Sequence, residues 1–151
     1  NRINPKYCLS GAMAMKSIYL THCSRDKDAS FKDSKEQVIP ELLYTSPGLQ
    51  QFIRYCKANA YEWAIFSDYY GVVLPHDKIS WYSKPPAEVN EEEFAGLLDN
   101  FIHRLSAYDQ IYFYHRQADA HPLFSRLVEL GKQKGMKISE LTEETIINGR
   151  V

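Results

Sequence analysis

The sequence of 151 residues lacks any apolar run near the roughly 18 residues that a membrane-spanning helix needs. It also lacks an excess of positive charge, because 18 Lys and Arg stand against 19 Asp and Glu, for a net charge of −1. A protein that binds nucleic acid or acidic membranes through general electrostatics carries a strong basic excess. We therefore expect no membrane partner, and the net charge does not favour binding to nucleic acid.

Cysteine is scarce, and its spacing does not indicate a metal site. The three cysteines, Cys8, Cys23 and Cys56, are an odd number without the short pairs typical of zinc sites. Free thiols are typical of reducing compartments, so we expect a cytoplasmic protein. No glycine-rich stretch that could cradle a phosphate is evident, and we expect neither a resident metal nor a cofactor.

The length predicts a single domain with a hydrophobic core of its own. Residues 1–14 show no periodicity, and we expect them to be a linker, a tag or a disordered tail. We assign residues 15–151 to one α/β domain. Tyrosine is unusually frequent, with 11 copies, and suits both clefts and cores because it buries a large ring yet keeps a polar tip.

The apolar pattern alternates between strands and helices. Short β-favouring runs predict strands over 17–22, 62–67, 110–115 and 137–142, with a further extended piece at 71–74. Helices are expected from Pro47 with Ser46 as its cap, from Asn90 with a capping box to Glu93, and from Pro122. The residues after 142 are weakly patterned, and we expect an edge strand or a tail. The order predicts a Rossmann-like three-layer sandwich with a mainly parallel sheet of four to five strands.

Polar side chains follow three of the predicted strands. In an open parallel sheet, ligands bind beyond the carboxyl ends of the strands, where the strand order reverses. The groups expected to share this edge are His22, Cys23, Ser24 and Lys27 from the first strand, Ser67, Asp68 and Tyr70 from the second, and His115, Arg116 and Asp119 from the third. The alternative is that these polar residues simply mark where each strand meets water.

Each candidate group also has a structural interpretation. Cys23 is a nucleophile if a neighbour lowers its pKa, and otherwise a small buried residue. Arg116 is the best candidate to hold an anion, and Gly71 is expected at a positive φ or a close approach. The remaining alternatives are a metal site from His22, Cys23, His115 and His121, helix capping by Asp119 and His121, and either stacking or packing by Tyr70.

Four segments form a recognisable series of motifs: Thr21-His22-Cys23-Ser24-Arg25-Asp26-Lys27, Leu43-Tyr44-Thr45-Ser46-Pro47-Gly48-Leu49, the run from Trp63 to Pro75, and Trp81-Tyr82. This series resembles one family of small bacterial, archaeal and phage domains whose activity is not established. This family is distantly similar to peroxide-stress proteins and to domains associated with tRNA-guanine transglycosylases. The pattern departs at His22, where the family has serine, and at Asp68-Tyr69, where it has a small and a basic residue. The second departure weighs against transferring an anionic ligand from the family.

The resemblance and the strand ends together imply a ligand-binding domain or an enzyme that acts on a nucleoside, a nucleotide or a modified base. The catalytic candidates are Ser67, Asp68, His115 and Cys23. The ligand-binding candidates are Ser24, Lys27, Tyr44, Ser46, Tyr70, Gly71 and Arg116. The alternatives are a noncatalytic, stress-related module that binds DNA or a protein, and a redox role through Cys23.

Overall fold

The computed structural model describes residues 15–148. The interpretation of residues 1–14 as a linker, tag or tail therefore concerns residues outside the described range. Within that range, none of the helices is both long enough and apolar enough to span a membrane.

A five-stranded sheet forms the middle layer of the molecule, in the order β3-β2-β1-β4-β5. The strands are β1 (Ser17–His22), β2 (Trp63–Ser67), β3 (Gly71–Val73), β4 (Gln110–Tyr114) and β5 (Ile138–Leu141). All neighbouring pairs are parallel except β2 and β3, which form an antiparallel hairpin. The predicted Rossmann-like sandwich with a mainly parallel sheet is therefore confirmed.

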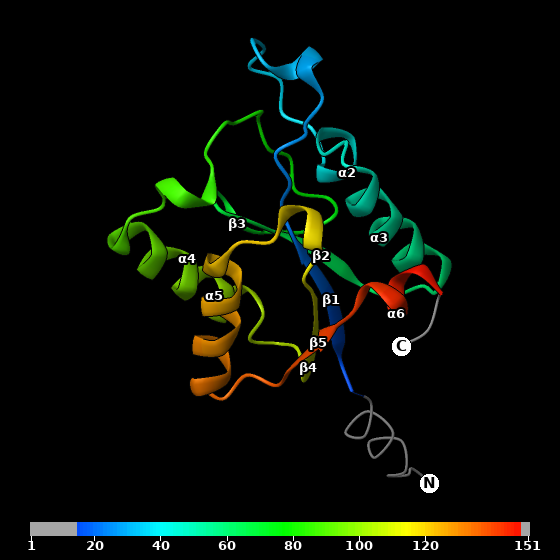
Figure 1. The fold of residues 1–151 in the computed structure, drawn as a ribbon, viewed down its shortest axis with the longest axis vertical. Coiled ribbons are helices and arrows are strands. Elements are labelled where there is room, and N and C mark those ends of the chain that lie inside the picture. The colour runs from blue at the N-terminus through cyan, green and yellow to red at the C-terminus, as the bar shows by residue number, and fades with distance from the viewer. Residues whose placement is uncertain (1–14, 149–151) are drawn as a thin grey trace, which may run out of the picture.

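Helices cover both faces of this sheet (Figure 1). On one side lie α3 (Pro47–Ala58) and α6 (Glu143–Ile147), and on the other lie α4 (Glu91–Arg104) and α5 (Pro122–Gln133). A single turn, α2 (Pro40–Leu43), precedes α3. Short 3₁₀ turns lie in the loops: η1 (Ala29–Phe31), η2 (Pro86–Glu88) and η3 (Gln117–Asp119).

The helix ends follow the expected capping chemistry in part. The Asn90 side chain accepts from the Glu93 N–H and Glu93 bonds back to the Asn90 N–H, which confirms the capping box of α4. His121 caps α5 by accepting from the Leu123 N–H. Ser46 occupies the cap position of α3, but its side chain makes no capping bond, so the expected cap was only half right.

The prediction for the end of the chain was wrong. Residues 143–147 form the short helix α6 instead of an edge strand or a tail. The Thr142 side chain caps α6 by accepting from the Thr145 N–H at 3.4 Å, and Ile146 is the buried residue of the helix. A helix this short depends on tertiary contacts, which leave little trace in the sequence pattern.

The core lies on both faces of the sheet. On one face, the buried Phe66 of β2 and Phe113 of β4 contact Phe101 of α4, and on the other face the buried Tyr114 of β4 contacts Phe52 of α3. Each buried phenylalanine side chain contributes about 1.5–3 kcal/mol relative to an exposed one. β1 pairs with β2 on one side and with β4 on the other, so the strand order reverses at β1. The crevice outside the carboxyl ends of β1 and β4 is therefore the place where open α/β sheets bind ligands.

Candidate functional site

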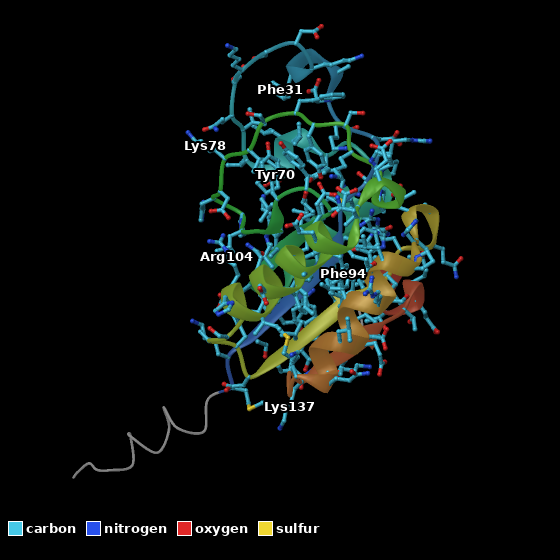
Figure 2. All side chains as sticks on the ribbon, turned by 90° about the vertical axis from the view of Figure 1, so that its left-hand side faces the viewer. Phe31, Tyr70, Lys78, Phe94, Arg104 and Lys137 are labelled. Carbon is cyan, nitrogen blue, oxygen red and sulfur yellow. The ribbon has the colours of Figure 1, made fainter. Side chains whose placement is uncertain are left out.

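A cleft of about 480 Å³ opens at the carboxyl edge of the sheet, and we call it the strand-end cleft. Its walls come from the loop after β1, the end of β2, the loop between β3 and α4, and η3. The lining residues are Cys23, Ser24, Arg25, Lys27, Lys32, Asp68, Trp81, Tyr82, Ser83, Lys84, Pro85, Pro86 and Asp119. In Figure 2, Phe31 marks this end of the molecule and Lys137 the opposite end.

Asp68 is the buried carboxylate of the strand-end cleft. It follows β2, is 3% exposed, and accepts through Oδ1 from the Cys23 thiol at a sulfur–oxygen distance of 3.5 Å. Its other oxygen, Oδ2, is buried and has no hydrogen-bond partner among residues 15–148. Burial raises the pKa of Asp68, and the nearby Lys27 ammonium opposes that shift. A buried acceptor without a donor is costly, so Oδ2 is suited to a donor supplied from outside the chain.

Cys23 lies beside this carboxylate and is itself buried. Burial and the neighbouring Asp68 charge raise the pKa of its thiol to about 12. The thiol is thus protonated at neutral pH, whereas a nucleophilic cysteine needs a lowered pKa. Cys23 acts here as a donor that holds Asp68, and the geometry gives no support to the nucleophilic or redox interpretation.

Positive charge gathers around the strand-end cleft. The Lys27 ammonium lies 4.3 Å from the centroid of the Tyr82 ring, and burial lowers the pKa of Lys27. The Lys32 ammonium lies 5.7 Å from the Trp81 ring. Arg25, Lys27, Lys32 and Lys84 contribute four cationic side chains against two carboxylates, Asp68 and Asp119. The cleft is therefore locally positive in a chain whose net charge is −1.

A chain of hydroxyl groups fixes the aromatic wall. Ser67 Oγ accepts from the Tyr69 and Tyr70 N–H groups, both at 3.0 Å, and donates to the Tyr82 hydroxyl at 2.9 Å. Tyr82 in turn shares a 2.5 Å hydrogen bond with Tyr44. Because both acceptor positions of Ser67 are taken, its proton goes to Tyr82, and Tyr82 donates to Tyr44. Ser67 and Tyr44 are both fully buried, and they position Tyr82 rather than line the cleft.

Arg116 holds the ends of β1 and β4 together. It is only 2% exposed, and its guanidinium donates to Thr21 Oγ1 at 2.8 Å, to the carbonyls of His22 and Cys23, and to Asp119 Oδ2 at 3.0 Å. The sequence predicts this side chain as the group that holds an anion. The structure places it behind the strand-end cleft instead, bonded to its own chain.

The remaining candidates lie around the strand-end cleft at different depths. Ser24 lines it, and its hydroxyl donates to the Asp26 carbonyl. His115 faces β5, with Nε2 placed 2.9 Å from Glu140, and does not line the cleft. Ser46 is buried at the start of α3. The Tyr70 hydroxyl donates to the Ser80 carbonyl.

Gly71 occupies the backbone conformation that the sequence predicts. Its φ is +81°, which confirms the expected positive value. A Cβ at this position would lie 2.3 Å from Asn100 Oδ1, which accepts from the Val72 N–H. Gly71 therefore shapes the β2–β3 hairpin.

The histidines expected as alternative metal ligands have other partners. His22 Nε2 accepts from the Arg116 N–H at 3.0 Å, and His121 caps α5. No group of three or more His, Cys, Asp and Glu side chains in the described part of the chain could hold a metal ion.

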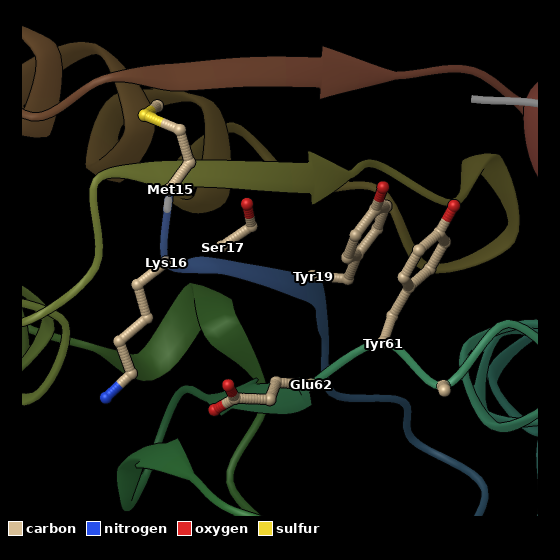
Figure 3. Close-up of a pocket in the computed structure, with 7 residues that line it drawn as sticks. Met15, Lys16, Ser17, Tyr19, Tyr61 and Glu62 are labelled. Carbon is tan, nitrogen blue, oxygen red and sulfur yellow. The ribbon is translucent and has the colours of Figure 1, made fainter. Parts of the chain in front are cut away.

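A second large hollow, of about 500 Å³, lies at the opposite, amino edge of the sheet (Figure 3). Tyr19 and Tyr61 line it, with Tyr19 stacked between Tyr61 at 4.3 Å and Tyr112 at 4.6 Å between ring centroids. None of the described buried polar atoms that lack a partner belongs to its lining. The strand-end cleft is therefore the better candidate site.

The sequence did not indicate several parts of the strand-end cleft. Arg25 and Lys32 belong to a segment of mixed charge that is typical of a solvated loop. The stretch from Trp81 to Pro86 has no periodicity that marks it as part of a site. These residues reach the site because the loop after β1 pairs at Val38 with Ile79 of the loop after β3.

No protein-family model, no curated protein and no solved structure matches this chain. The resemblance to the bacterial, archaeal and phage domain family therefore stays a prediction.

Proposed function

We propose that the protein binds a nucleotide-like ligand in the strand-end cleft. The observation that carries this proposal is the buried Asp68 Oδ2, an acceptor without a donor at the base of a positively charged, aromatic-walled cleft. Such an acceptor suits the N–H groups of a base or the hydroxyl groups of a sugar.

The aromatic wall supports a flat or sugar ring in the ligand. Trp81 and Tyr82 both line the strand-end cleft, and the hydroxyl chain through Ser67 fixes the Tyr82 ring. Tyr82 is buried, with Lys27 over its ring and Tyr69 stacked on it, so the partly exposed Trp81 ring beside it is the surface on which a ligand ring would stack. A volume of about 480 Å³ lies within the range of small-molecule sites.

The cationic rim supports an anionic group. Lys27, Lys32 and Arg25 stand on one wall, where a phosphate would meet point charges and a guanidinium fork. The ammonium of Lys27 is already partly desolvated, which strengthens its attraction for an anion. A base, a sugar and a phosphate satisfy all three features at once.

If the site is catalytic, Asp68 is the acid–base group that the geometry favours. Its carboxyl is buried, its pKa is raised, and one oxygen faces no protein donor. Lys27 would hold the substrate, and Cys23 would orient the carboxylate. Ser67 and His115, the other sequence candidates, do not line the strand-end cleft.

The test is a thermal-shift and calorimetric screen of free bases, nucleosides, 5′-nucleotides and inorganic phosphate. At a hundredfold excess over Kd, a bound nucleotide is expected to raise Tm by roughly 5–10 °C. Asp68→Asn is expected to weaken binding about tenfold or more, and Lys27→Gln by a similar factor.

Matched controls exist at the surface. Asp99 is exposed on α4, and Lys134 is exposed at the amino edge of the sheet. Asp99→Asn and Lys134→Gln should bind like the wild type. If no member of the panel raises Tm, or if Asp68→Asn binds as tightly as Asp99→Asn, the proposal is overturned.

A further inference from the structure

A smaller hollow of about 310 Å³ adjoins the strand-end cleft, and we call it the α4 hollow. Its lining residues are Asp68, Tyr69, Tyr70, Lys84, Glu93, Gly96, Leu97 and Asn100. Asp68 and Lys84 line both spaces, so the two share a boundary. The rings of Tyr69 and Tyr82, one from each lining, stack at 5.4 Å between centroids and 20° between planes.

The charges differ between the two spaces. The α4 hollow has two carboxylates, Asp68 and Glu93, and one cation, Lys84, which is paired with Glu93. An anion is therefore not expected inside it. A neutral ring with hydrogen-bond donors suits its carboxylates, and an anionic link suits Lys84 at the shared boundary.

Tyr69 offers an unused ring surface at this place. It is 55% exposed, the only tyrosine among the large hydrophobic side chains that stand exposed in the described part of the chain. The Tyr69 ring is held in place by stacking on Tyr82 and by an edge contact with Tyr70. Aromatic side chains held in this way are typical platforms for nucleobases.

Gly96 provides an independent observation. It lies inside α4, where glycine costs about 1 kcal/mol relative to alanine. A Cβ at Gly96 would meet no atom within 4 Å, whereas Gly48, Gly71 and Gly131 are crowded and Gly135 has a positive φ. Among the described glycines, Gly96 is the only one at which neither a neighbouring atom nor a positive φ requires glycine. It also lines the α4 hollow. Close approach of a ligand explains a glycine there.

We propose that the ligand carries two ring-bearing nucleoside units joined by a phosphate, one in the strand-end cleft and one in the α4 hollow. This inference rests on the proposed function and extends it. The first unit lies against Trp81, the linking phosphate passes Lys84, and the second ring lies beside Tyr69 over Gly96.

The test compares 5′-mononucleotides with the matching 5′-phosphorylated dinucleotides of adenine and of guanine, by calorimetry. Stacking of the second ring is expected to make a dinucleotide bind about tenfold more tightly than its mononucleotide. Gly96→Leu places a side chain in the α4 hollow and should abolish that tenfold gain while leaving mononucleotide affinity unchanged. Gly96→Ala keeps most of the space and should retain the gain. Leucine and alanine both favour helices more than glycine, so α4 is expected to fold in each variant.

Tyr69 gives a second pair of variants. Tyr69→Ala should reduce the gain to less than threefold, and Tyr69→Phe, which keeps the ring, should preserve it. Such a ligand could be a free dinucleotide or part of a nucleic-acid strand, and a single strand of ten nucleotides distinguishes the two. Tighter binding of the strand than of the dinucleotide would assign the two units to a strand, and otherwise they belong to a free dinucleotide. Two nucleoside units are bound in either case.

The two proposals fail in different ways. If mononucleotides bind, Asp68→Asn weakens them, and dinucleotides gain nothing, the two-unit inference is overturned and the strand-end cleft stands. The two-unit inference is likewise overturned if Gly96→Leu leaves the gain intact. If neither mononucleotides nor dinucleotides bind, the proposed function itself fails.

Discussion

Cys23 and Asp68 contact each other in both directions. The Cys23 thiol donates to Asp68 Oδ1, and the Asp68 backbone N–H donates back to the same sulfur, each at 3.5 Å. This reciprocal pair joins the ends of β1 and β2 and fixes the carboxylate in one orientation. One oxygen is thereby used within the chain, and the other, Oδ2, is left for a donor.

Asp68 is expected to destabilise the fold as it ionises. Its pKa is raised in the folded state, so the folded protein binds its proton more tightly than the unfolded chain does. This contribution is fully present below the unfolded pKa of about 3.9 and is lost as the pH rises through the folded pKa. Asp68→Asn should therefore match the wild type near pH 3.5 and be more stable at pH 7, as measured by urea unfolding. If the free energy of unfolding of the wild type instead rose relative to that of Asp68→Asn with increasing pH, this prediction would be contradicted.

His22 is expected to stay neutral far below its usual range. Burial, and then the Arg116 charge, lowers the pKa of His22 to about 3, and its Nε2 accepts from the Arg116 N–H. The proton therefore sits on Nδ1, which faces the Cys23 carbonyl at 3.2 Å. NMR should show the Nδ1–H form unchanged from pH 8 to pH 4.5, whereas the ring in urea-unfolded protein titrates near 6.5.

The same shift links His22 to stability. Because the pKa of His22 is lower in the folded state, its contribution to stability is fully present above pH 6.5, the pKa of the unfolded chain, and is lost as the pH falls toward 3. The loss amounts to at most about 1.4 kcal/mol per pH unit. An imidazole that titrates near 6.5 in the folded protein would contradict this account.

Arg116 is expected to act through stability. Arg116→Gln would leave the His22 and Cys23 carbonyls and Asp119 without their donor, at a cost of about 3–5 kcal/mol in the free energy of unfolding. The control is Arg126→Gln, which removes an exposed pair with Glu91 and should cost less than about 1 kcal/mol. A variant of Arg116 that unfolds like the wild type but loses ligand binding would restore the role that the sequence predicts.

Gly71 is expected to tolerate no side chain. Gly71→Ala combines a φ of +81° with a Cβ 2.3 Å from Asn100 Oδ1, so it should cost about 2 kcal/mol or more. Gly96→Ala, in the open interior of α4, should instead be neutral or stabilising by up to about 1 kcal/mol. Urea unfolding of the two variants checks the contrast, and equal effects would refute it.

Much of the fold could be predicted because its signals are local. The strands carry β-favouring runs, and Pro47, Asn90 and Pro122 mark helix starts that the structure retains. The exceptions are α2 and α6, four and five residues long, which tertiary contacts stabilise. Periodicity cannot reveal elements of one turn.

The sequence predicts the position of the site better than it predicts the contacts that its side chains make. Cys23, Ser24, Lys27 and Asp68 line one cleft because parallel strands end at one edge. The sequence does not show that Arg116 turns back to backbone carbonyls, or that His115 faces β5. Which side of the sheet a loop residue faces depends on packing between distant segments. The same holds for Lys84, which reaches the strand-end cleft from an aperiodic loop.

The most direct test of the central claim is an NMR titration of the labelled protein with 5′-mononucleotides, followed at backbone amides and at the Trp81 indole N–H. The strand-end cleft predicts shift changes at Cys23 to Lys27, at Asp68 and at Trp81 to Lys84, and their loss in Asp68→Asn. Changes confined to Lys16, Tyr19 and Tyr61 at the amino edge, or the absence of changes with every nucleotide, would contradict it.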